Sequence, residues 1–334
     1  MNAAPMLELR DITRRFEKKL DFAGRIAQRL GAPVREEVVH AVDRVNLTVR
    51  KGEVVGLVGE SGCGKSTLGR MVAGILPPTE GTILRDGRDI KALTGAEARQ
   101  MKLRTQMIFQ DPYASLNPRM RVQDIVGEAP RVHGLLDGAA FDDYVDEQMR
   151  RAGLDPGFKR RYPHQFSGGQ RQRIGIARAL AVKPDFIVCD EAVAALDVSI
   201  QAQILNLMKE LQSRMGLTYL FISHNLAVVR QVSDQIGVMY LGRIAELAPA
   251  ESLFRRPRHP YTRALMEAIP DLDMTGRARI PVGGEVPSPI NPPTGCAFHP
   301  RCPLAGPRCK AERPELKPAG DAMVACHAVE EGRD

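Results

Sequence analysis

A glycine-rich loop at residues 59–67, GESGCGKST, has the residue types and spacing that hold a chain of phosphates, because it fits the pattern G-x-x-x-x-G-K-S/T. Its glycines let backbone N–H groups converge on phosphate oxygens without Cβ clashes, and the following helix adds the positive end of its dipole. Lys65 is expected to reach the β- and γ-phosphates, and the Ser66 hydroxyl to bind Mg²⁺. The predicted nucleotide-binding residues of the loop are Gly59, Ser61, Gly62, Cys63, Gly64, Lys65, Ser66 and Thr67.

Two cysteines lie within or near the predicted nucleotide site, Cys63 in the loop and Cys189 in the apolar run FIVCD. The thiol of Cys63, beside a helix N-terminus, could have a lowered pKa and react with electrophiles. The alternative, which we favour, is that only the backbone N–H of Cys63 serves the loop. Cys189 lies within an apolar run and is expected to be a small core residue.

An acidic pair follows the apolar run FIVCD, which is typical of a strand buried on both faces. Asp190 and Glu191 therefore lie at the carboxyl end of a strand, where α/β sheets bind ligands. Asp190 suits Mg²⁺ through its water shell, and Glu191 suits a base that polarises an attacking water. About 125 residues after a phosphate loop, this pair predicts a nucleotide hydrolase.

A second glycine-containing helix start occurs at FSGGQRQR, before the apolar run IGIARAL. Ser167 is a plausible N-cap, and the exposed amides behind it form a second phosphate site. One chain has no need of two such sites. A head-to-tail dimer explains them, because each phosphate loop would face the partner's Ser-Gly-Gly.

Elements that position these groups can be read from hydrophobic periodicity. Strands are expected at MLELRDITRRF, VDRVNLTV, EVVGLVG, FIVCD and TYLFISH, and two more in IGVMYLGRIAEL. A helix through LGRMVAGIL is expected to stop at Pro77-Pro78, and GTILRDGRDI to form a hairpin. Residues about 117–180 are expected to be mostly helical, and Ile200, Ile204, Leu207, Leu211 and Met215 form a core-facing helical stripe. The alternation predicts an α/β fold with a mainly parallel sheet.

Composition excludes several classes of protein. The chain has 334 residues, of which 43% are apolar, so a core is available and a disordered or collagen-like chain is excluded. It has no apolar run near the roughly 18 residues that cross a bilayer, and its N-terminus has no apolar leader, so we expect a cytoplasmic chain. Its net charge of +7 arises from 47 basic and 40 acidic residues spread along the chain, and a solvated surface explains it as well as nucleic acid does.

The chain changes character near Pro249, so we predict domains at residues 1–250 and 251–334. The second is rich in Pro, Gly and Arg and has the spacing Cys296-x5-Cys302-x6-Cys309-x16-Cys326. A reducing cytoplasm disfavours disulfides between these cysteines, and four thiolates suit Zn²⁺ or an iron–sulfur cluster. His299 and His327 are possible substitute ligands, and four unligated thiols are the alternative.

Taken together, residues 6–250 resemble an ATP-binding subunit of ABC transporters. GESGCGKST is similar to the Walker A motif of that family, FIVCDE to Walker B, and FSGGQRQR to the signature motif, with Phe166 where Leu is usual. Gln110 in MIFQDPYASLNP matches the Q-loop glutamine that contacts Mg²⁺ and couples to the membrane subunits. Ala195-Leu196-Asp197 resembles the D-loop, and His224 in FISHNL matches the switch histidine that holds the γ-phosphate and attacking water.

The resemblance implies an ABC-type P-loop NTPase core with a mainly parallel sheet, an antiparallel β subdomain and a helical subdomain at about 117–180. It implies ATP and Mg²⁺ as cofactors and Glu191, His224, Gln110 and Lys65 as catalytic residues. The predicted signature-side ATP contacts are Ser167, Gly168, Gly169, Gln170 and Asp197. The family stacks adenine on an aromatic side chain near the N-terminus. Phe16 is our candidate for it and Phe22 is a rival.

Two departures from the family pattern are Ala192-Val193-Ala194, where Pro-Thr-Ser is usual, and Asn225 after the switch histidine, where Asp is common. Neither removes a catalytic group, so we expect a competent hydrolytic site. Both departures could alter loop stiffness or dimer contacts. The charged insert at Glu17–Glu37 has helical composition and no readable function.

The segments RRPRHPYTRAL and EVPSPINPPTGCAFHPRCP resemble the C-terminal extension of dipeptide and oligopeptide importer ATPases. This resemblance implies a 4Fe–4S cluster at the four cysteines in preference to zinc. It also implies two permease subunits, a second related ATPase in a heterodimer, an extracytoplasmic peptide-binding protein, and a peripheral position on the cytoplasmic side of the inner membrane. Nickel or another solute is an alternative cargo. A nucleic-acid ABC ATPase and a small-molecule P-loop kinase are disfavoured alternatives.

A local basic run comprises Arg255, Arg256, Arg258 and Arg263. It could lie near anionic lipid headgroups, which would contribute about 1 kcal/mol per charge. A solvated or domain-bridging face is the interpretation that we favour.

Overall fold

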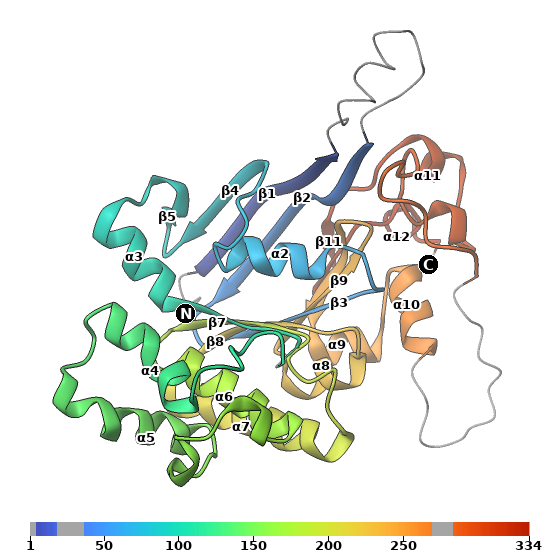
Figure 1. The fold of residues 1–334 in the computed structure, drawn as a ribbon. Coiled ribbons are helices and arrows are strands. Elements are labelled where there is room, and N and C mark those ends of the chain that lie inside the picture. The colour runs from blue at the N-terminus through green and yellow to red at the C-terminus, as the bar shows by residue number, and fades with distance from the viewer. Residues whose placement is uncertain (1–4, 19–36, 112, 269–282, 334) are drawn as a thin grey trace, which may run out of the picture.

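Two β-sheets organise the chain in the computed structural model, which describes residues 5–18, 37–111, 113–268 and 283–333 (Figure 1). The larger sheet has the strand order β11-β12-β10-β9-β3-β8-β7-β6, and the smaller has the order β2-β1-β4-β5. The strands of the larger sheet are β3 (Val54–Val58), β6 (Thr105–Ile108), β7 (Phe186–Asp190), β8 (Thr218–Ile222), β9 (Gln235–Tyr240), β10 (Arg243–Pro249), β11 (Lys317–Ala319) and β12 (Ala322–Val324). The smaller sheet comprises β1 (Pro5–Lys18), β2 (Glu37–Arg50), β4 (Glu80–Arg85) and β5 (Arg88–Asp89).

The middle of the larger sheet is parallel, as the alternation of strands and helices predicts. Strand β3 pairs in parallel with β8 and β9, and β7 pairs in parallel with β6 and β8. Every residue of β3, β7 and β8 is buried, because helices or the second sheet cover both faces. The remaining pairs, β9–β10, β10–β12 and β11–β12, are antiparallel, as are all pairs in the smaller sheet.

The helices divide between the two faces of the larger sheet. Helix α2 contacts β2, β7 and β8, whereas α8 contacts β3 and α6 contacts β6. Figure 1 shows α4, α5, α6 and α7 together as one group of helices. The helices are α2 (Lys65–Val72), α3 (Gly95–Arg104), α4 (Val122–Val132), α5 (Phe141–Arg151), α6 (Gly168–Leu180), α7 (Val198–Met215), α8 (Leu226–Val232), α9 (Ala250–Arg255), α10 (Pro260–Glu267), α11 (Pro307–Ala311) and α12 (His327–Glu330). Short 3-10 turns occupy Ile90–Ala92, Gly138–Ala140, Pro156–Phe158, Pro163–Gln165 and His299–Arg301.

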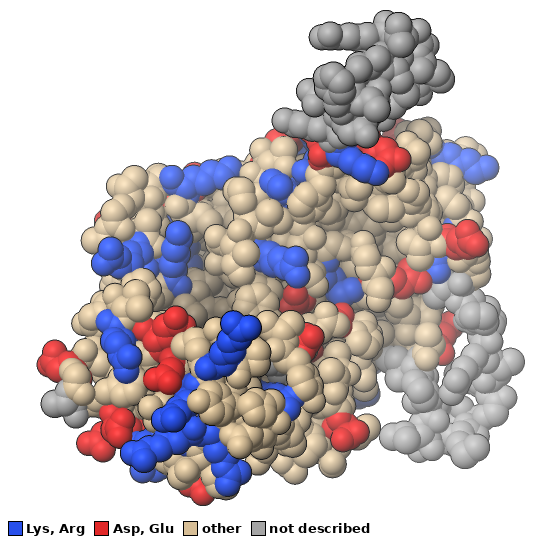
Figure 2. Space-filling model, in the orientation of Figure 1, with Lys and Arg blue, Asp and Glu red and all other residues tan. Residues whose placement is uncertain are grey.

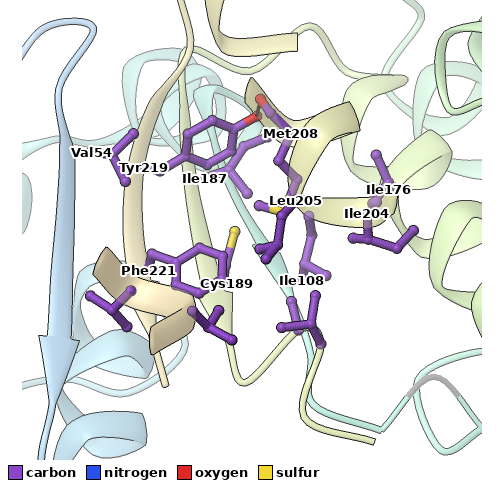
Figure 3. Close-up of a cluster of buried hydrophobic side chains, with 14 of the residues drawn as sticks. Val54, Ile108, Ile176, Ile187, Cys189, Ile204, Leu205, Met208, Tyr219 and Phe221 are labelled. Carbon is purple, nitrogen blue, oxygen red and sulfur yellow. Dashed lines mark hydrogen bonds between the residues drawn. The ribbon is translucent and has the colours of Figure 1, made fainter. Parts of the chain in front are cut away.

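Successive residues of the central strands enter two different cores. Phe186 and Val188 of β7 join a core with α2 and the antiparallel sheet, whereas Ile187 and Cys189 join the core with α4 to α8 and the C-terminal extension. Figure 3 shows the second core, in which Cys189 lies among apolar side chains from several elements. Cys189 is therefore the core residue that its position predicts. The parallel sheet is fixed between two apolar layers, and its loops are left to carry chemistry.

The structure corrects several local predictions. Helix α2 ends at Val72, before Pro77-Pro78, because Ala73 caps it and Gly74 follows in a left-handed conformation with φ 71°. Helix α3 and strand β6 are not among the predicted elements, because the hydrophobic pattern in their region is too short to indicate a helix or a strand. The hairpin at Asp86-Gly87 is confirmed by the β4–β5 pairing.

The extension after residue 250 contains regular elements that its composition does not predict. Strand β12 pairs with β10, so the extension adds two strands to the larger sheet. Residues 19–36 of the charged insert lie outside the described residues, and the insert's ends, Glu17 and Glu37, belong to the paired strands β1 and β2. No helix in the described part of the chain is both long enough and apolar enough to cross a membrane.

Candidate nucleotide-binding and hydrolysis site

The phosphate loop joins β3 to α2, as its spacing predicts. Lys65 points back into the loop, where its Nζ donates to the carbonyl oxygens of Gly59 at 2.7 Å and Glu60 at 2.9 Å. A Cβ on Gly64 would lie 2.1 Å from the Ala41 carbonyl oxygen, and the φ of 104° at Gly64 is itself unfavourable for other residues. Glycine is thus required for the loop to pass so close to β2.

Cys63 is a packed loop residue rather than a reactive one. Its side chain is buried, and this burial raises the pKa of the thiol even though Lys65 lies beside it. The expectation of a lowered pKa at Cys63 is therefore wrong, and the alternative, that only its backbone N–H serves the loop, stays a prediction. The nearby Lys65 lowers the pKa but does not compensate for the loss of solvent around the sulfur.

Ser66 and Asp190 bring two oxygen ligands together. The Ser66 hydroxyl donates to Asp190 Oδ1 at 2.7 Å, across 124 positions of sequence. Asp190 is the last residue of β7 and is buried, and burial raises the pKa of its carboxyl against the opposing effects of Ser66 and Arg70. A hydroxyl and a carboxylate at this spacing are ligands that Mg²⁺ accepts, so these residues fit the ion.

Glu191 lies between two polar side chains from the neighbouring strands. Gln110 Nε2 donates to Glu191 Oε2 at 2.6 Å, and His224 Nδ1 lies 3.3 Å from Glu191 Oε1. Gln110 follows β6, Glu191 follows β7 and His224 follows β8, so three adjacent parallel strands deliver them to one edge. Glu191 takes a left-handed φ of 49°, which turns the chain sharply at the strand end.

The second predicted phosphate site is the start of α6. Ser167 accepts from the N–H of Gln170, and the Gln170 side chain accepts from the N–H of Ser167, which makes a complete capping box. A Cβ on Gly169 would lie 2.5 Å from Ile200 of α7, so glycine permits α7 to pack there, and Gly168 lies next to Leu196. Asp197 is the N-cap residue of α7. Figure 1 shows α6 in the helical group and α2 apart from it.

The adenine candidate, Phe16, lies in β1 and is partly exposed. The Arg14 guanidinium lies 4.6 Å from its ring centroid, so one face of the ring already has a cationic neighbour. The rival candidate, Phe22, lies outside the described residues.

The departures from the expected motifs have structural roles. Ala192 and Val193 are buried in the core with α4 to α8, where small and apolar side chains fit. Asn225 caps α8, because its Oδ1 accepts from the N–H groups of Ala227 and Val228 at 3.0 and 3.4 Å. Phe166 is buried and meets Phe158 edge-on at 6.3 Å.

The four C-terminal cysteines are free thiols, and Cys309 and Cys326 are buried. Burial raises the pKa of Cys296 to about 11, and the neighbouring thiols of Cys302 and Cys326 act in the same direction. Within the described ranges, no group of three or more Cys, His, Asp or Glu side chains has the arrangement of a metal-ion site.

The two histidines proposed as substitute ligands contact backbone oxygens. His299 Nδ1 lies 2.9 Å from the Cys296 carbonyl oxygen, and His327 Nε2 lies 3.1 Å from the Glu312 carbonyl oxygen.

The basic run after residue 250 makes internal contacts. Arg255 pairs with Glu251, Arg258 Nη2 lies 3.9 Å from Asp321 Oδ1, and Arg263 donates to the Pro257 carbonyl. Basic and acidic side chains are interspersed on the face shown in Figure 2. Arg258 links the segment after β10 to the turn before β12, and both lie in the predicted second domain, so this contact is internal to that domain and the domain-bridging interpretation stays a prediction.

Sequence reasoning missed Glu60, the second residue of the phosphate loop. Its carboxylate pairs with Arg301 at 2.8 Å, and its backbone N–H donates to Tyr261 Oη at 2.9 Å. The two partners of Glu60 lie in motifs of the extension, Tyr261 in HPYT and Arg301 in Arg-Cys. These motifs do not indicate which residues their side chains contact.

Comparisons with known proteins identify the family of the chain. Residues 42–194 match the ABC transporter family, and residues 245–309 match the C-terminal region of oligopeptide and dipeptide transporters. The chain is 50% identical over 331 residues to the oligopeptide transport ATP-binding protein AppF of Bacillus subtilis, with 98% of each chain covered. It is 52% identical to the putative oligopeptide transport ATP-binding protein YkfD of the same organism, covering 88% of this chain and 91% of that one.

Solved structures of ABC cassettes share the fold. CbiO1 of Clostridium perfringens, part of the CbiONQ transporter complex, has a TM-score of 0.61 at 26% identity, covering 75% of this chain and 91% of its own. The cassette MJ0796, solved as a dimer bound to ADP and Pi, has a TM-score of 0.61 at 28% identity, covering 73% and 99%. This chain therefore belongs to the ABC transporter ATP-binding proteins of the oligopeptide and dipeptide import type.

Proposed function

We propose that this chain hydrolyses ATP with Glu191 as the general base and that the cycle drives import of peptides through a membrane permease. The observation that carries the proposal is the position of the Glu191 carboxylate between Gln110 and His224. The strand that precedes the phosphate loop ends at the same edge of the sheet. A carboxylate at this place is suited to accept a proton from the water that attacks the γ-phosphate.

The remaining roles follow from the same edge. Lys65 binds the β- and γ-phosphates, and Ser66, Asp190 and Gln110 hold Mg²⁺ directly or through water. His224 holds the γ-phosphate and orients the attacking water. Bound Mg²⁺ would neutralise charge that develops on the phosphate oxygens. Phe16 is the proposed adenine contact, and the exposure of its ring supports this role.

We further propose that two cassettes complete each other's sites. The amides at the start of α6 and Asp197 belong to a helical group that does not include α2, so they are available to a nucleotide on a partner cassette. The dimer solved for MJ0796 supports this arrangement. The proposed partner is a second, related ATPase. The nucleotide bound to that partner would contact five residues of this chain: Ser167, Gly168, Gly169, Gln170 and Asp197.

The segment Gln110–Asn117 is the proposed contact for the permease subunits. The Tyr113 ring is exposed, yet the Arg171 guanidinium lies 3.7 Å from its centroid, and Arg178 donates to the Ser115 carbonyl at 2.6 Å. Both arginines belong to α6, the helix that begins with the second phosphate site. A movement of this segment would therefore be passed to the groups that close on ATP.

The C-terminal extension, residues 251–334, is proposed to hold a 4Fe–4S cluster at Cys296, Cys302, Cys309 and Cys326, with Zn²⁺ as the alternative. One support is that, besides burial, the four thiols lie close enough for neighbouring thiols to raise the pKa of Cys296, Cys302 and Cys326. A second is that the backbone N–H groups of Phe298 and Leu304 bond to Cys296 and Cys302. Such bonds stabilise thiolates that ligate iron. The cluster would cross-link a segment that has little apolar core of its own.

The cluster proposal is tested by anaerobic purification. We expect a brown protein with broad visible absorbance and about four iron atoms per chain. Zinc without iron, or neither metal, would overturn the cluster. A variant with all four cysteines replaced by serine serves as the control for adventitious iron.

Transport is tested by reconstitution on the cytoplasmic side of a membrane. The complete system comprises the two permease subunits, both ATPases and the extracytoplasmic binding protein. We expect a peptide to stimulate ATP hydrolysis and to be taken up, and Lys65→Ala to abolish both. Stimulation by Ni²⁺ without any response to peptides would contradict peptide import and favour the alternative cargo.

A further inference from the structure

The C-terminal extension reaches the phosphate loop through a partly buried ion pair. Arg301 Nη1 lies 2.8 Å from Glu60 Oε2, and its Nη2 lies 3.0 Å from Glu60 Oε1, so the guanidinium and carboxylate form a bidentate pair. The Arg301 side chain is 4% exposed and that of Glu60 is 26% exposed. A pair with this geometry fixes orientation as well as distance.

Glu60 is held a second time, through its backbone. Its N–H donates to Tyr261 Oη at 2.9 Å, and Tyr261 is fully buried in the first turn of α10. The Tyr261 ring packs at 4.6 Å from that of Tyr240 and at 5.4 Å from that of Phe298. Because Phe298 lies in the cysteine-containing segment, that segment also fixes the position of the tyrosine.

Both contacts are anchored beside cysteines. Arg301 directly precedes Cys302 in the sequence. On the other route, the N–H of Tyr261 donates to His259 Nδ1 at 3.0 Å, and the buried His259 ring is hydrogen-bonded to the backbone of Ala325, which precedes Cys326. The folded conformation of the cysteine segment therefore sets the positions of the Arg301 and Tyr261 side chains.

On the loop side, Glu60 is linked to the phosphate-binding lysine. The carbonyl oxygen of Glu60 accepts a hydrogen bond from Lys65 Nζ at 2.9 Å. A displacement of the Glu60 backbone would therefore alter the position of the ammonium group that binds phosphate, along with the amides that follow Glu60 in the loop. The contacts form one continuous path from the cysteine segment to the nucleotide site.

We propose that Arg301 and Tyr261 are positioning residues for the phosphate loop, so that docking of the C-terminal extension sets the affinity of this chain for ATP. The inference rests on the proposed function, because it requires ATP to bind at this loop. The extension is then a clamp on the nucleotide site as well as a part of the fold.

The test is equilibrium binding of a fluorescent ATP analogue to the full chain with Mg²⁺. Arg301→Gln and Glu60→Gln each remove the ion pair, one from each side. We expect each to weaken binding about three- to tenfold. We expect the double variant to be no weaker than the poorer single variant, since both changes remove the same pair. Tyr261→Phe, which keeps the ring and loses only the hydroxyl, is expected to weaken binding as well.

The matched control is Arg313→Gln. Arg313 belongs to the same extension and pairs with Asp43 of β2 at 3.0 Å, but this pair does not involve the phosphate loop. Thermal unfolding of every variant separates loss of folding from loss of affinity. Steady-state hydrolysis adds a second readout: the KM for ATP should rise in Arg301→Gln while kcat stays within about twofold of the unmodified chain.

The outcomes separate the inference from the proposed function. Normal affinity in Arg301→Gln and Glu60→Gln would overturn the clamp, and so would an equal loss in Arg313→Gln, which would indicate general docking. Lys65→Ala tests the site itself: if it binds ATP as tightly as the unmodified chain does, the assignment of the nucleotide site fails. If Lys65→Ala loses binding and the Glu60 variants do not, only the clamp fails.

Discussion

Glu191 Oε1 lies 3.3 Å from His224 Nδ1, although the two residues follow different strands. The contact exists because β7 and β8 are adjacent and parallel, so their carboxyl ends meet at one edge. Gln110 Nε2 bonds to the other oxygen of the same carboxylate at 2.6 Å. The carboxylate is thus fixed from both sides before any reaction begins, which is the preorganisation that a general base requires.

His224→Ala should separate chemistry from binding. The substitution removes the group that we propose to orient the attacking water, and positioned acid–base groups contribute about a hundredfold or more. We expect kcat to fall by about that factor while the affinity for ATP changes little. Rapid-quench hydrolysis together with equilibrium binding measures both quantities. An unchanged kcat would show that His224 has no part in the reaction.

Ser66→Ala should change the requirement for Mg²⁺. The hydroxyl lies 2.7 Å from Asp190 Oδ1 and is one of the three side-chain groups, with Asp190 and Gln110, that are proposed to hold the ion. Without it, we expect half-maximal hydrolysis to need about tenfold more Mg²⁺, in line with the loss of one ligand. Titration of hydrolysis with Mg²⁺ at saturating ATP measures the shift. Thr67→Ala, in the next position of the loop, is the comparison variant.

The pH dependence of stability should carry a contribution from His259. Burial lowers the pKa of this ring to about 4 from an ordinary 6.5, so between these values the unfolded chain binds more protons than the folded one. The contribution of neutral His259 to the free energy of unfolding is fully present above about pH 6.5 and is lost as the pH falls towards 4. We expect a loss of about 2 kcal/mol between pH 8 and pH 5.

Denaturant unfolding of His259→Asn at the two pH values tests this contribution. The Tyr261 N–H now donates to His259 Nδ1 at 3.0 Å. Asparagine keeps an N-cap acceptor for this N–H, but the asparagine side chain does not titrate. The variant should therefore lose less stability on acidification than the unmodified chain. Equal losses in the two proteins would exclude His259 as the source.

Gly64→Ala should damage the phosphate loop itself. The added Cβ would lie 2.1 Å from the Ala41 carbonyl oxygen, and alanine disfavours the φ of 104°. We expect a loss of about 2 kcal/mol in stability together with a loss of ATP affinity. Gly62→Ala is the matched control, because a Cβ at Gly62 meets nothing within 4 Å although its φ of 81° is also positive. Equal effects of the two substitutions would assign the damage to backbone strain alone.

The parts of the site that the sequence could predict are those with fixed local spacing. Lys65 and Ser66 follow a short glycine pattern, and Asp190 and Glu191 end a buried apolar run, so their elements and edge could be inferred from parallel-sheet geometry. The contact between Ser66 and Asp190 follows from that inference, even though 124 positions separate them.

The contacts of Glu60 could not be predicted in this way. Arg301 is 241 positions from Glu60, and nothing in its local sequence indicates which surface it faces. The path depends on β12 joining β10, a pairing of short strands in a segment rich in proline and glycine. Periodicity is uninformative for strands of three residues. The environment of Cys63 also required the structure, because burial and the neighbouring Lys65 act on the pKa of its thiol in opposite directions.

The central claim, that Glu191 is the base of an ATPase, is tested most directly by Glu191→Gln. The change keeps the shape of the side chain and removes its capacity to accept a proton. Single-turnover hydrolysis and ATP binding are measured on the same preparation. The account predicts that the variant binds MgATP with normal affinity and hydrolyses it at least about a hundredfold more slowly. Hydrolysis at the unmodified rate would contradict it.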